Sequence, residues 1–261
     1  MSDSSKVCLV IGGTGGLGRG IALDLASTGW KTIVAGRNQT KGDEIVKEIT
    51  SSGGTATFLP VDITSPSSIS DLHEKAVSTY GRLDAAINSA GTTGDVVKFA
   101  DSSPENTAAV LSINLHGVIL SMQHQIRAMQ SNPSGSGGRI INMSSVYGSH
   151  GGIWASIYSG TKHALEGITK SVALEYSNPK DNVLVNCIAP GVIVTEMTAV
   201  IADPSVLPDG ELKEYCMGLR KQYAQERYGE VSDIARGVRY LLESPWVTGT
   251  TLQIEGGFGA R

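Results

Sequence analysis

Short apolar runs alternate along the chain with longer stretches in which apolar residues recur at helical spacing. The short runs have the length and β-branched content of buried strands, and the longer stretches have the period of amphipathic helices. The pattern predicts seven strands, at Val7–Ile11, Thr32–Ala35, Thr55–Leu59, Ala85–Asn88, Arg139–Met143, Leu184–Ile188 and Thr251–Ile254. It predicts helices over residues 17–28, 40–51, 66–80, 104–130, 156–177 and 231–243.

Local start signals agree with two of these helices, because Ser65-Pro66 and Ser103-Pro104 each place a capping residue before a proline at the first helical position. Strands that alternate with helices are typical of an α/β fold with helices on both faces of a parallel sheet. Right-handed crossovers make this sheet doubly wound, with its ligand crevice beyond the carboxyl ends of the strands. We expect one domain over residues 1–261, since no change in composition marks a linker.

A glycine-rich run at residues 12–18 links the first predicted strand to the first predicted helix. Such a turn presents backbone N–H groups and a helix N-terminus to a pyrophosphate, as in Rossmann-type dinucleotide-binding sheets. Two registers are open, because Gly13, Gly15 and Gly18 match GxGxxG while Gly12, Gly16 and Gly18 match GxxxGxG. Either register predicts a dinucleotide site.

The residue after the second predicted strand bears on the identity of the dinucleotide. An acidic side chain there would hydrogen-bond the adenosine ribose of NAD, but this chain has Arg37. A planar guanidinium suits a phosphate, which a carboxylate would repel. The sequence therefore favours NADP(H) over NAD(H), with the Thr14 hydroxyl as a further donor; a solvated arginine is the alternative.

Polar and small residues also follow the third and fourth predicted strands. Asp62 can accept a hydrogen bond from the adenine amino group, or it can cap the next helix. The run Asn88-Ser89-Ala90-Gly91 lets the backbone approach a ligand closely, and Asn88 can tie neighbouring turns together.

Tyr158 and Lys162 lie one turn apart in the predicted helix 156–177, so their side chains share a face. A free tyrosine has a pKa of about 10, which a nearby ammonium group and an oxidised nicotinamide would lower toward the working range. Ser145 follows a strand end and can donate to a substrate carbonyl as charge develops on its oxygen. Ser144 competes for this role, but alternation along the strand turns only one of the two toward the ligand.

These segments together resemble the short-chain dehydrogenase/reductase (SDR) family, and the resemblance covers essentially the whole chain. It is carried by Gly12-x-x-x-Gly16-x-Gly18, Asp62, Asn88-Ser89-Ala90-Gly91, Asn114, Ser145, Tyr158-x-x-x-Lys162 and Pro190-Gly191-x-x-x-Thr195. Gly36-Arg37 looks like the NADPH-preferring members. The resemblance implies hydride transfer between NADP(H) and a carbonyl or secondary alcohol.

The resemblance also implies roles for individual residues. Tyr158 would be the general acid and base, Ser145 would orient and polarise the carbonyl, and Lys162 would hold the ribose and lower the tyrosine pKa. Asn114, a polar residue in the apolar part of a long predicted helix, would hold a water in a proton relay; from the sequence alone a kink or a water site fits it. The expected cofactor contacts are Gly12, Thr14, Gly16, Leu17, Gly18, Arg37, Asn38, Asp62, Ile63, Asn88, Ala90, Gly91, Tyr158, Lys162, Pro190, Gly191, Ile193 and Thr195.

The strand and helix rhythm breaks over residues 195–227, which are rich in apolar and aromatic side chains. An insertion above the crevice is typical of a substrate lid, although a helical pair that merely packs on the body would look similar. A lid of this composition predicts a medium-sized apolar ketone or alcohol, contacted by Ser145, Tyr147, Trp154 and Met197. Reduction of a 3-oxoacyl thioester is the alternative reaction, and a non-catalytic dinucleotide-binding sensor or scaffold is the alternative class.

Composition narrows the remaining possibilities. A net charge of −4 argues against nucleic acid or an anionic membrane as partner, and no apolar run is long enough for a membrane span. The three cysteines lack a pairing pattern, the five histidines lack metal-ligand spacing, and residues 1–6 lack the apolar core of a signal peptide. We therefore expect a cytoplasmic protein without a metal. The family resemblance implies a homotetramer or homodimer, with the long helices 104–130 and 156–177 paired between subunits of the tetramer.

Overall fold

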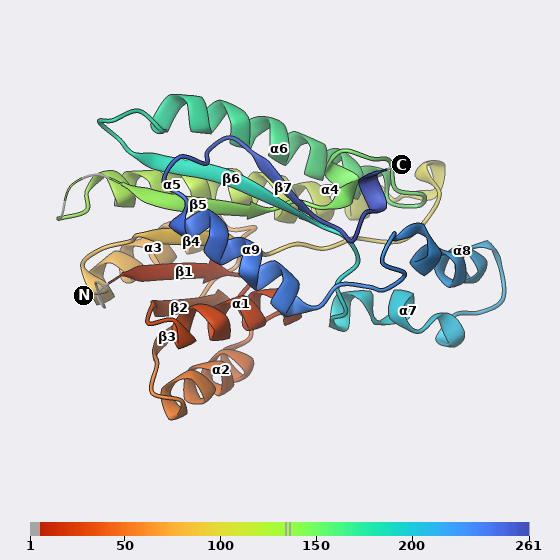
Figure 1. Ribbon diagram of the computed structural model, residues 1–261, viewed down its shortest axis with the longest axis horizontal. Coiled ribbons are helices and arrows are strands. Elements are labelled where there is room, and N and C mark those ends of the chain that lie inside the picture. Colours follow the sequence, from red (N-terminus) through yellow and green to blue (C-terminus); the bar gives the residue numbers. More distant parts are fainter. Residues whose placement is uncertain (1–5, 134, 136, 261) are drawn as a thin grey trace.

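The computed structural model describes residues 6–133, 135 and 137–260, and its seven strands form one parallel sheet in the order β3-β2-β1-β4-β5-β6-β7 (Figure 1). Met1–Ser5, part of the segment expected to lack a signal peptide, lies outside the described residues. The strands are β1 (Val7–Ile11), β2 (Lys31–Gly36), β3 (Thr55–Pro60), β4 (Ala85–Asn88), β5 (Gly138–Met143), β6 (Val183–Pro190) and β7 (Thr251–Ile254). The predicted doubly wound sheet is confirmed, and four strands are one or two residues longer at an end than predicted.

Helices connect the strands, and the two helices with start signals in the sequence begin where these signals indicate. They are α1 (Gly16–Ser27), α2 (Gln39–Ser51), α3 (Pro66–Tyr80), α4 (Pro104–Leu111), α5 (Gly117–Gln130), α6 (Ser156–Tyr176), α7 (Ala199–Ala202), α8 (Glu211–Leu219) and α9 (Val231–Glu243). The Ser65 hydroxyl accepts from the Ser68 N–H, and the Ser103 hydroxyl accepts from the Asn106 N–H. Both predicted caps are therefore present, each followed by proline in the first turn.

The sheet separates two apolar layers, and strand alternation decides which residue enters which layer. In β1, Val7, Leu9 and Ile11 pack with residues of α3, α5 and α6. Cys8 and Val10 point to the opposite face and pack with residues of α1, α2 and α9, which Figure 1 shows together on one side. All five β1 residues are at most 1% exposed, so this strand lies at the centre of the core.

The long helix predicted over residues 104–130 is not continuous. A π-helical turn, Ser112–His116, separates α4 from α5. The fully buried Asn114 lies in this turn, and its amide group exchanges two hydrogen bonds of 2.8 Å with the backbone of Thr92. The extra residue of the π turn thus falls at the polar position that interrupts the apolar pattern, and such turns often mark functional sites.

The segment after β6 contains α7, α8 and three short 3₁₀ turns, Glu196–Thr198, Pro204–Val206 and Arg220–Gln222. Figure 1 shows α7 and α8 beyond the carboxyl ends of the strands, away from the helical layers. No helix among the described residues has both the length and the apolar character needed to cross a bilayer.

Candidate active site

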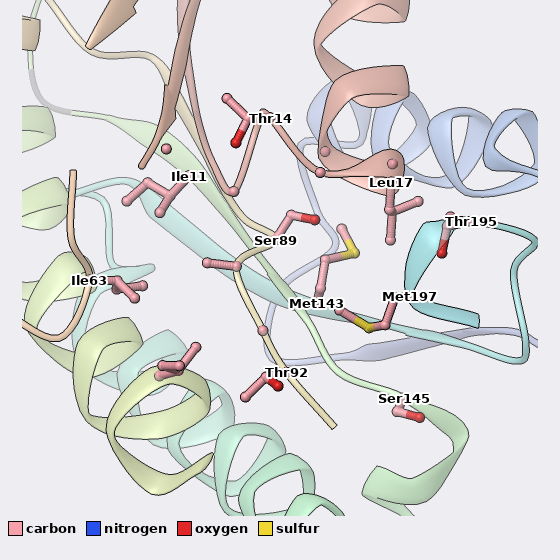
Figure 2. Close-up of a pocket in the computed structure, with 18 of the residues that line it drawn as sticks. Ile11, Thr14, Leu17, Ile63, Ser89, Thr92, Met143, Ser145, Thr195 and Met197 are labelled. Carbon is pink, nitrogen blue, oxygen red and sulfur yellow. The ribbon is translucent and has the colours of Figure 1, made fainter. Parts of the chain in front are cut away.

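A cleft of about 400 Å³ opens at the carboxyl edge of the sheet (Figure 2). Its walls come from the turns after β1 to β6 and from α6. Most of the residues expected to contact cofactor or substrate line it: Gly12, Thr14, Gly16, Leu17, Gly18, Arg37, Asp62, Ile63, Ala90, Gly91, Ser145, Tyr158, Lys162, Pro190, Gly191, Ile193, Thr195 and Met197.

The glycine turn forms one wall of the cleft and has no room for side chains at the positions of the GxxxGxG register. Gly12 has φ +82°, and a Cβ there would lie 2.5 Å from the Ala90 backbone nitrogen. A Cβ on Gly18 would lie 2.3 Å from the Gly12 carbonyl oxygen, whereas one on Gly15 would meet nothing closer than 3.5 Å. No described side chain caps the N-terminus of α1, and the first residues of this helix line the cleft, where uncapped N–H groups can bind a pyrophosphate.

Arg37 lines the cleft directly after β2 and has no ion-pair partner among the described residues. Asp62 lies nearby, and its Oδ1 accepts from the Thr64 N–H and hydroxyl at 2.9 and 2.7 Å. These hydrogen bonds, with a smaller contribution from Arg37, hold the pKa of the Asp62 carboxyl below its usual value. The expected contact Asn38 instead caps α2, accepting from the Lys41 N–H at 2.9 Å, and is not among the lining residues.

Ser145 and Tyr158 meet where the cleft reaches the end of β5. Ser145 stands at the start of the 3₁₀ turn Val146–Gly148, and its hydroxyl accepts from the Tyr147 N–H at 3.2 Å. Burial raises the pKa of the Tyr158 phenol, while a hydrogen bond with Ser145 opposes this rise. The pair thus joins a protonated phenol to a hydroxyl group at one point of the cleft.

Lys162 lies one turn beyond Tyr158 on α6, with its Nζ 5.4 Å from the centre of the Tyr158 ring. This Nζ donates to the Met143 carbonyl at 2.6 Å, and burial lowers the pKa of the ammonium group to about 8. In the protein alone the ammonium group is therefore engaged with the backbone, and burial dominates the pKa of Tyr158. The lowering of the tyrosine pKa by Lys162 stays a prediction for the cofactor-bound protein.

Asn88 and Asn114, both expected in the site, bind protein groups rather than line the cleft. Asn88 is 1% exposed and forms hydrogen bonds with Gln125 and Asn142 below the cleft floor. The Asn114 side chain is hydrogen-bonded to the backbone of Thr92, and Asn114 directly follows the lining residue Ile113. Both asparagines thus fix the backbone around the cleft.

The turn after β6 closes the far end of the cleft. Thr195 and Thr198 form a capping box at the start of the turn Glu196–Thr198, and the Thr198 hydroxyl also donates to the Ile193 carbonyl. Behind this turn the buried Tyr223 hydroxyl accepts from the Val192 N–H at 2.9 Å. Burial raises the pKa of Tyr223 to about 12, so its phenol stays protonated and supports the loop.

Aromatic side chains connect α8 to the loop between Ser145 and Tyr158. The hydroxyl groups of Tyr147 and Tyr215 are 3.0 Å apart, and Trp154 meets Tyr215 edge-on with 5.7 Å between ring centres. Trp154 lines a small crevice that also reaches Tyr158, while neither Trp154 nor Tyr147 lines the main cleft. Of the proposed substrate contacts, Ser145 and Met197 lie in the main cleft, with Met143 beside them (Figure 2).

The sequence profile of the family described as short chain dehydrogenase matches residues 6–205. The chain is a short-chain dehydrogenase/reductase. It belongs to a family of oxidoreductases that use a nicotinamide dinucleotide, which agrees with the glycine turn and the cleft described above.

Relatives of this SDR match over nearly their whole length. Carbonyl reductase family member 4 of Xenopus laevis is 34% identical over 253 residues, 97% of this chain and 98% of the relative. The 3-oxoacyl-(acyl-carrier-protein) reductase of Aquifex aeolicus is 35% identical over 255 residues, 97% of this chain and 96% of the relative. The crystal structure of a variant of actinorhodin polyketide ketoreductase with NADPH superimposes with a TM-score of 0.89 and 29% identity, covering 100% of both chains.

Several residues line the cleft of this SDR although the sequence reasoning did not single them out as site residues. Thr92, Met143 and Thr198 are the main examples. The Thr195-x-x-Thr198 spacing is a helix-start signal that could have found Thr198, and Thr92 directly follows the small-residue run. Met143 ends a strand, and the periodicity of its neighbours predicts only that it is buried.

Proposed function

We propose that this SDR is an NADPH-dependent reductase that converts a medium-sized apolar ketone to a secondary alcohol, and that it also runs in reverse. The observation that carries the proposal is the convergence of Ser145, Tyr158 and Lys162 on the cleft beside the glycine turn. Reduction needs a hydride and a proton at one carbonyl. A bound nicotinamide would supply the hydride. The three side chains would donate the proton, orient the carbonyl and stabilise the phenolate that remains.

Tyr158 is the proposed general acid. Burial raises the pKa of its phenol, so the group is protonated at neutral pH and can donate to the carbonyl oxygen as that oxygen becomes alkoxide-like. Ser145, in contact with Tyr158, donates a second hydrogen bond to the same oxygen and orients the carbonyl. In the reverse direction the phenolate accepts the alcohol proton.

Lys162 is the proposed ribose ligand. Burial lowers its pKa to about 8, so the ammonium form predominates at neutral pH, and Nζ lies close to the Tyr158 ring. A positive charge at this distance stabilises the phenolate that remains after proton donation. Asn114 completes the arrangement as the proposed holder of a relay water, since its π-helical turn leaves backbone groups out of the regular helical bonding.

NADPH is the proposed cofactor because Arg37, which forms no ion pair with any described residue, lines the cleft directly after β2, where a Rossmann-type sheet would hold the adenosine ribose. The NADPH in the actinorhodin ketoreductase crystal structure supports the same choice. A 3-oxoacyl thioester is a second candidate substrate, supported by the Aquifex aeolicus relative.

Turnover of NADPH with a panel of apolar ketones and a 3-oxoacyl thioester tests the reaction, with Tyr158→Phe beside the wild type. We expect the substitution to lower kcat by at least about 100-fold, because it removes the proton donor and leaves the ring. Tyr240→Phe, on the outer surface of α9, is the matched control. Unchanged turnover in Tyr158→Phe would contradict the mechanism, and no turnover with any carbonyl would favour a dinucleotide-binding sensor or scaffold.

The cofactor choice is tested separately by Arg37→Asp. We expect the ratio of kcat/KM for NADPH to that for NADH to fall by about 10-fold to 100-fold, because a charge-assisted bond to phosphate is lost and a repulsive charge is gained. Lys47→Asp makes a charge change of equal size on the exposed face of α2, away from the lining residues. An unchanged ratio in Arg37→Asp would rule out this assignment.

A further inference from the structure

We propose that Glu166 and Ser144 are positioning residues, which hold Ser145 at its working place through a buried hydrogen bond between α6 and the end of β5. The inference rests on the proposed ketone reduction, in which Ser145 donates to the carbonyl oxygen. Neither Glu166 nor the Ser144 hydroxyl has a part in the proton transfer itself.

Successive residues along one face of α6 contact the residues at the end of β5. Tyr158, Lys162 and Glu166 follow one another at intervals of four, so they form a row along the helix. Lys162 Nζ donates to the Met143 carbonyl at 2.6 Å, and Tyr158 contacts Ser145. The row therefore aligns the helix with the strand end that leads into the catalytic turn.

Glu166 provides the third contact of this row. The Ser144 hydroxyl donates to Glu166 Oε1 at 2.6 Å, and the Ser144 N–H donates to the Ile188 carbonyl of β6 at 2.7 Å. Ser144 is thus tied to a helix by its side chain and to a neighbouring strand by its backbone. Because Ser145 is the next residue, these two bonds limit where its hydroxyl can lie.

The turn that carries Ser145 closes over this hydrogen bond. A Cβ on Gly148 would lie 2.2 Å from Glu166 Oε1 and 2.4 Å from the Ser144 hydroxyl oxygen. Only glycine therefore allows the turn Val146–Gly148 to pack on the pair. Glu166 therefore contacts both Ser144, just before the catalytic turn, and Gly148, at the end of that turn.

The burial of Glu166 indicates that its carboxylate has a specific role at this position. Glu166 is 8% exposed and Ser144 is 4% exposed, and Glu166 has no ion-pair partner among the residues that the structure describes. A buried carboxylate reduces stability unless hydrogen bonds compensate it, so an apolar residue would pack here at lower cost. What the carboxylate adds is a directional, charge-assisted acceptor for Ser144. Groups that orient a reacting residue in this way affect rate, because small displacements of the reacting groups slow the chemistry strongly.

The first test compares Glu166→Ala, Ser144→Ala and Glu166→Gln with the wild type in ketone reduction. We expect either alanine variant to lower kcat by about 10-fold while the KM for NADPH stays within about 2-fold, because the glycine turn and Arg37 are untouched. Glu166→Gln keeps an amide oxygen that can accept from Ser144, so we expect its kcat to stay within about 3-fold of wild type. Glu175→Ala, exposed on the same helix, is the matched control.

The second test asks whether the effect acts through Ser145. In a Ser145→Ala background, Glu166→Ala should lower kcat by less than about 2-fold, since nothing is left to position. The proposal would be overturned if Glu166→Ala lowered kcat by a further 10-fold in the Ser145→Ala background. It would also be overturned if both alanine variants kept the wild-type kcat, or if Glu166→Gln were as slow as Glu166→Ala. Tyr158→Phe, assayed in parallel, distinguishes failure of the proposed reaction from failure of the positioning role. If Tyr158→Phe retains full turnover, the proposed reaction itself is wrong. If Tyr158→Phe is inactive but Glu166→Ala is fully active, only the positioning role is rejected.

Discussion

His73 of α3 is 4% exposed, and its ring stacks on that of His124 of α5 with 5.3 Å between the ring centres. Its Nδ1 is 2.7 Å from the Ile69 carbonyl oxygen, whereas Nε2 is buried without a hydrogen-bond partner. Burial, with a smaller contribution from the charge of His124, lowers the pKa of this histidine from 6.5 to about 4, although the hydrogen bond to the Ile69 carbonyl opposes the shift. The folded protein therefore holds His73 neutral at a pH where the unfolded chain protonates it.

This shift predicts a loss of stability on mild acidification. Between about pH 6.5 and pH 4 the unfolded state binds more protons than the folded state, so the free energy of unfolding falls as the pH falls through this window. At pH 5 the contribution of His73 is a loss of about 2 kcal/mol relative to pH 7.5. His73→Leu should remove this part of the loss, as measured by urea unfolding at both pH values and one protein concentration.

His163→Leu is the control for the loss of a histidine, because His163 lies on the exposed side of α6. It should leave the pH dependence of the unfolding free energy as in the wild type. A His73→Leu variant with the wild-type difference between pH 7.5 and pH 5 would show that His73 is not the group responsible.

At the residue scale, the sequence identified most of the cleft but could not choose between neighbours. Strand alternation predicts that only one of Ser144 and Ser145 faces the ligand. In the structure the Ser144 hydroxyl donates a hydrogen bond to Glu166. Asn88 fits a site residue by its position at the end of β4, yet its side chain forms buried hydrogen bonds with Gln125 and Asn142. These partners lie 37 and 54 residues away in sequence, so periodicity alone does not reveal them.

Helix α8 is joined to the loop that carries Ser145 by the 3.0 Å contact between the hydroxyl groups of Tyr215 and Tyr147. The start of the same segment is joined to α2, where Lys41 pairs with Glu196 at 3.1 Å. Residues 195–227 are therefore tied to two separate elements, the loop that carries Ser145 and α2. This arrangement supports the proposed lid over the substrate.

Tyr215→Phe tests the role of α8. The substitution removes one hydrogen bond of about 1 kcal/mol and leaves the ring, so we expect the KM of an apolar ketone to rise by about 5-fold. The KM for NADPH should not change, because Tyr215 contacts Tyr147 in the loop after Ser145, whereas the proposed phosphate contacts are the glycine turn and Arg37. Steady-state kinetics with each substrate varied in turn provide the measurement.

Tyr240→Phe also removes a tyrosine hydroxyl, on the far helix α9, and should change neither constant. If Tyr215→Phe raises the KM for NADPH as much as that for the ketone, α8 does not act on the substrate side alone. An unchanged ketone KM would contradict the proposed lid.

At the element scale, periodicity predicted every strand, and it predicted most helices to within a residue at each end. The exception is residues 104–130, where the apolar period continues through the π turn and only the polar Asn114 signals a break. The path of residues 195–227 could not be predicted, because it depends on aromatic contacts with a loop far away in sequence. Short helices such as Ala199–Ala202 also lack the length over which a period can be measured.

The whole molecule exposes apolar side chains on the two helical segments that the family resemblance pairs between subunits. Leu174 of α6 is 88% exposed, and Leu111 of α4 is 43% exposed. We propose a homotetramer in which these surfaces are covered. Leu174→Glu should place a charge in that contact and lower the mass in sedimentation velocity by about half, to that of a dimer.

Val206→Glu is the control, because Val206 is 67% exposed on the segment above the cleft rather than on these helices. We expect it to sediment as the wild type does. A monomeric wild type, or a Leu174→Glu variant that sediments as a tetramer, would exclude this assembly.

The order of strands in the sheet has a consequence for synthesis of the chain. β1, β2 and β3 fill one half of the sheet, and β4, β5, β6 and β7 then follow in sequence on the free side of β1. Each strand that leaves the ribosome after β3 can therefore add to a single growing edge, and no strand must enter between two that are already paired. The glycine turn and Arg37 can be in place before α6 has been translated. The nascent chain can thus form the turns proposed to bind NADPH first, and the residues proposed to transfer the proton assemble onto them afterwards.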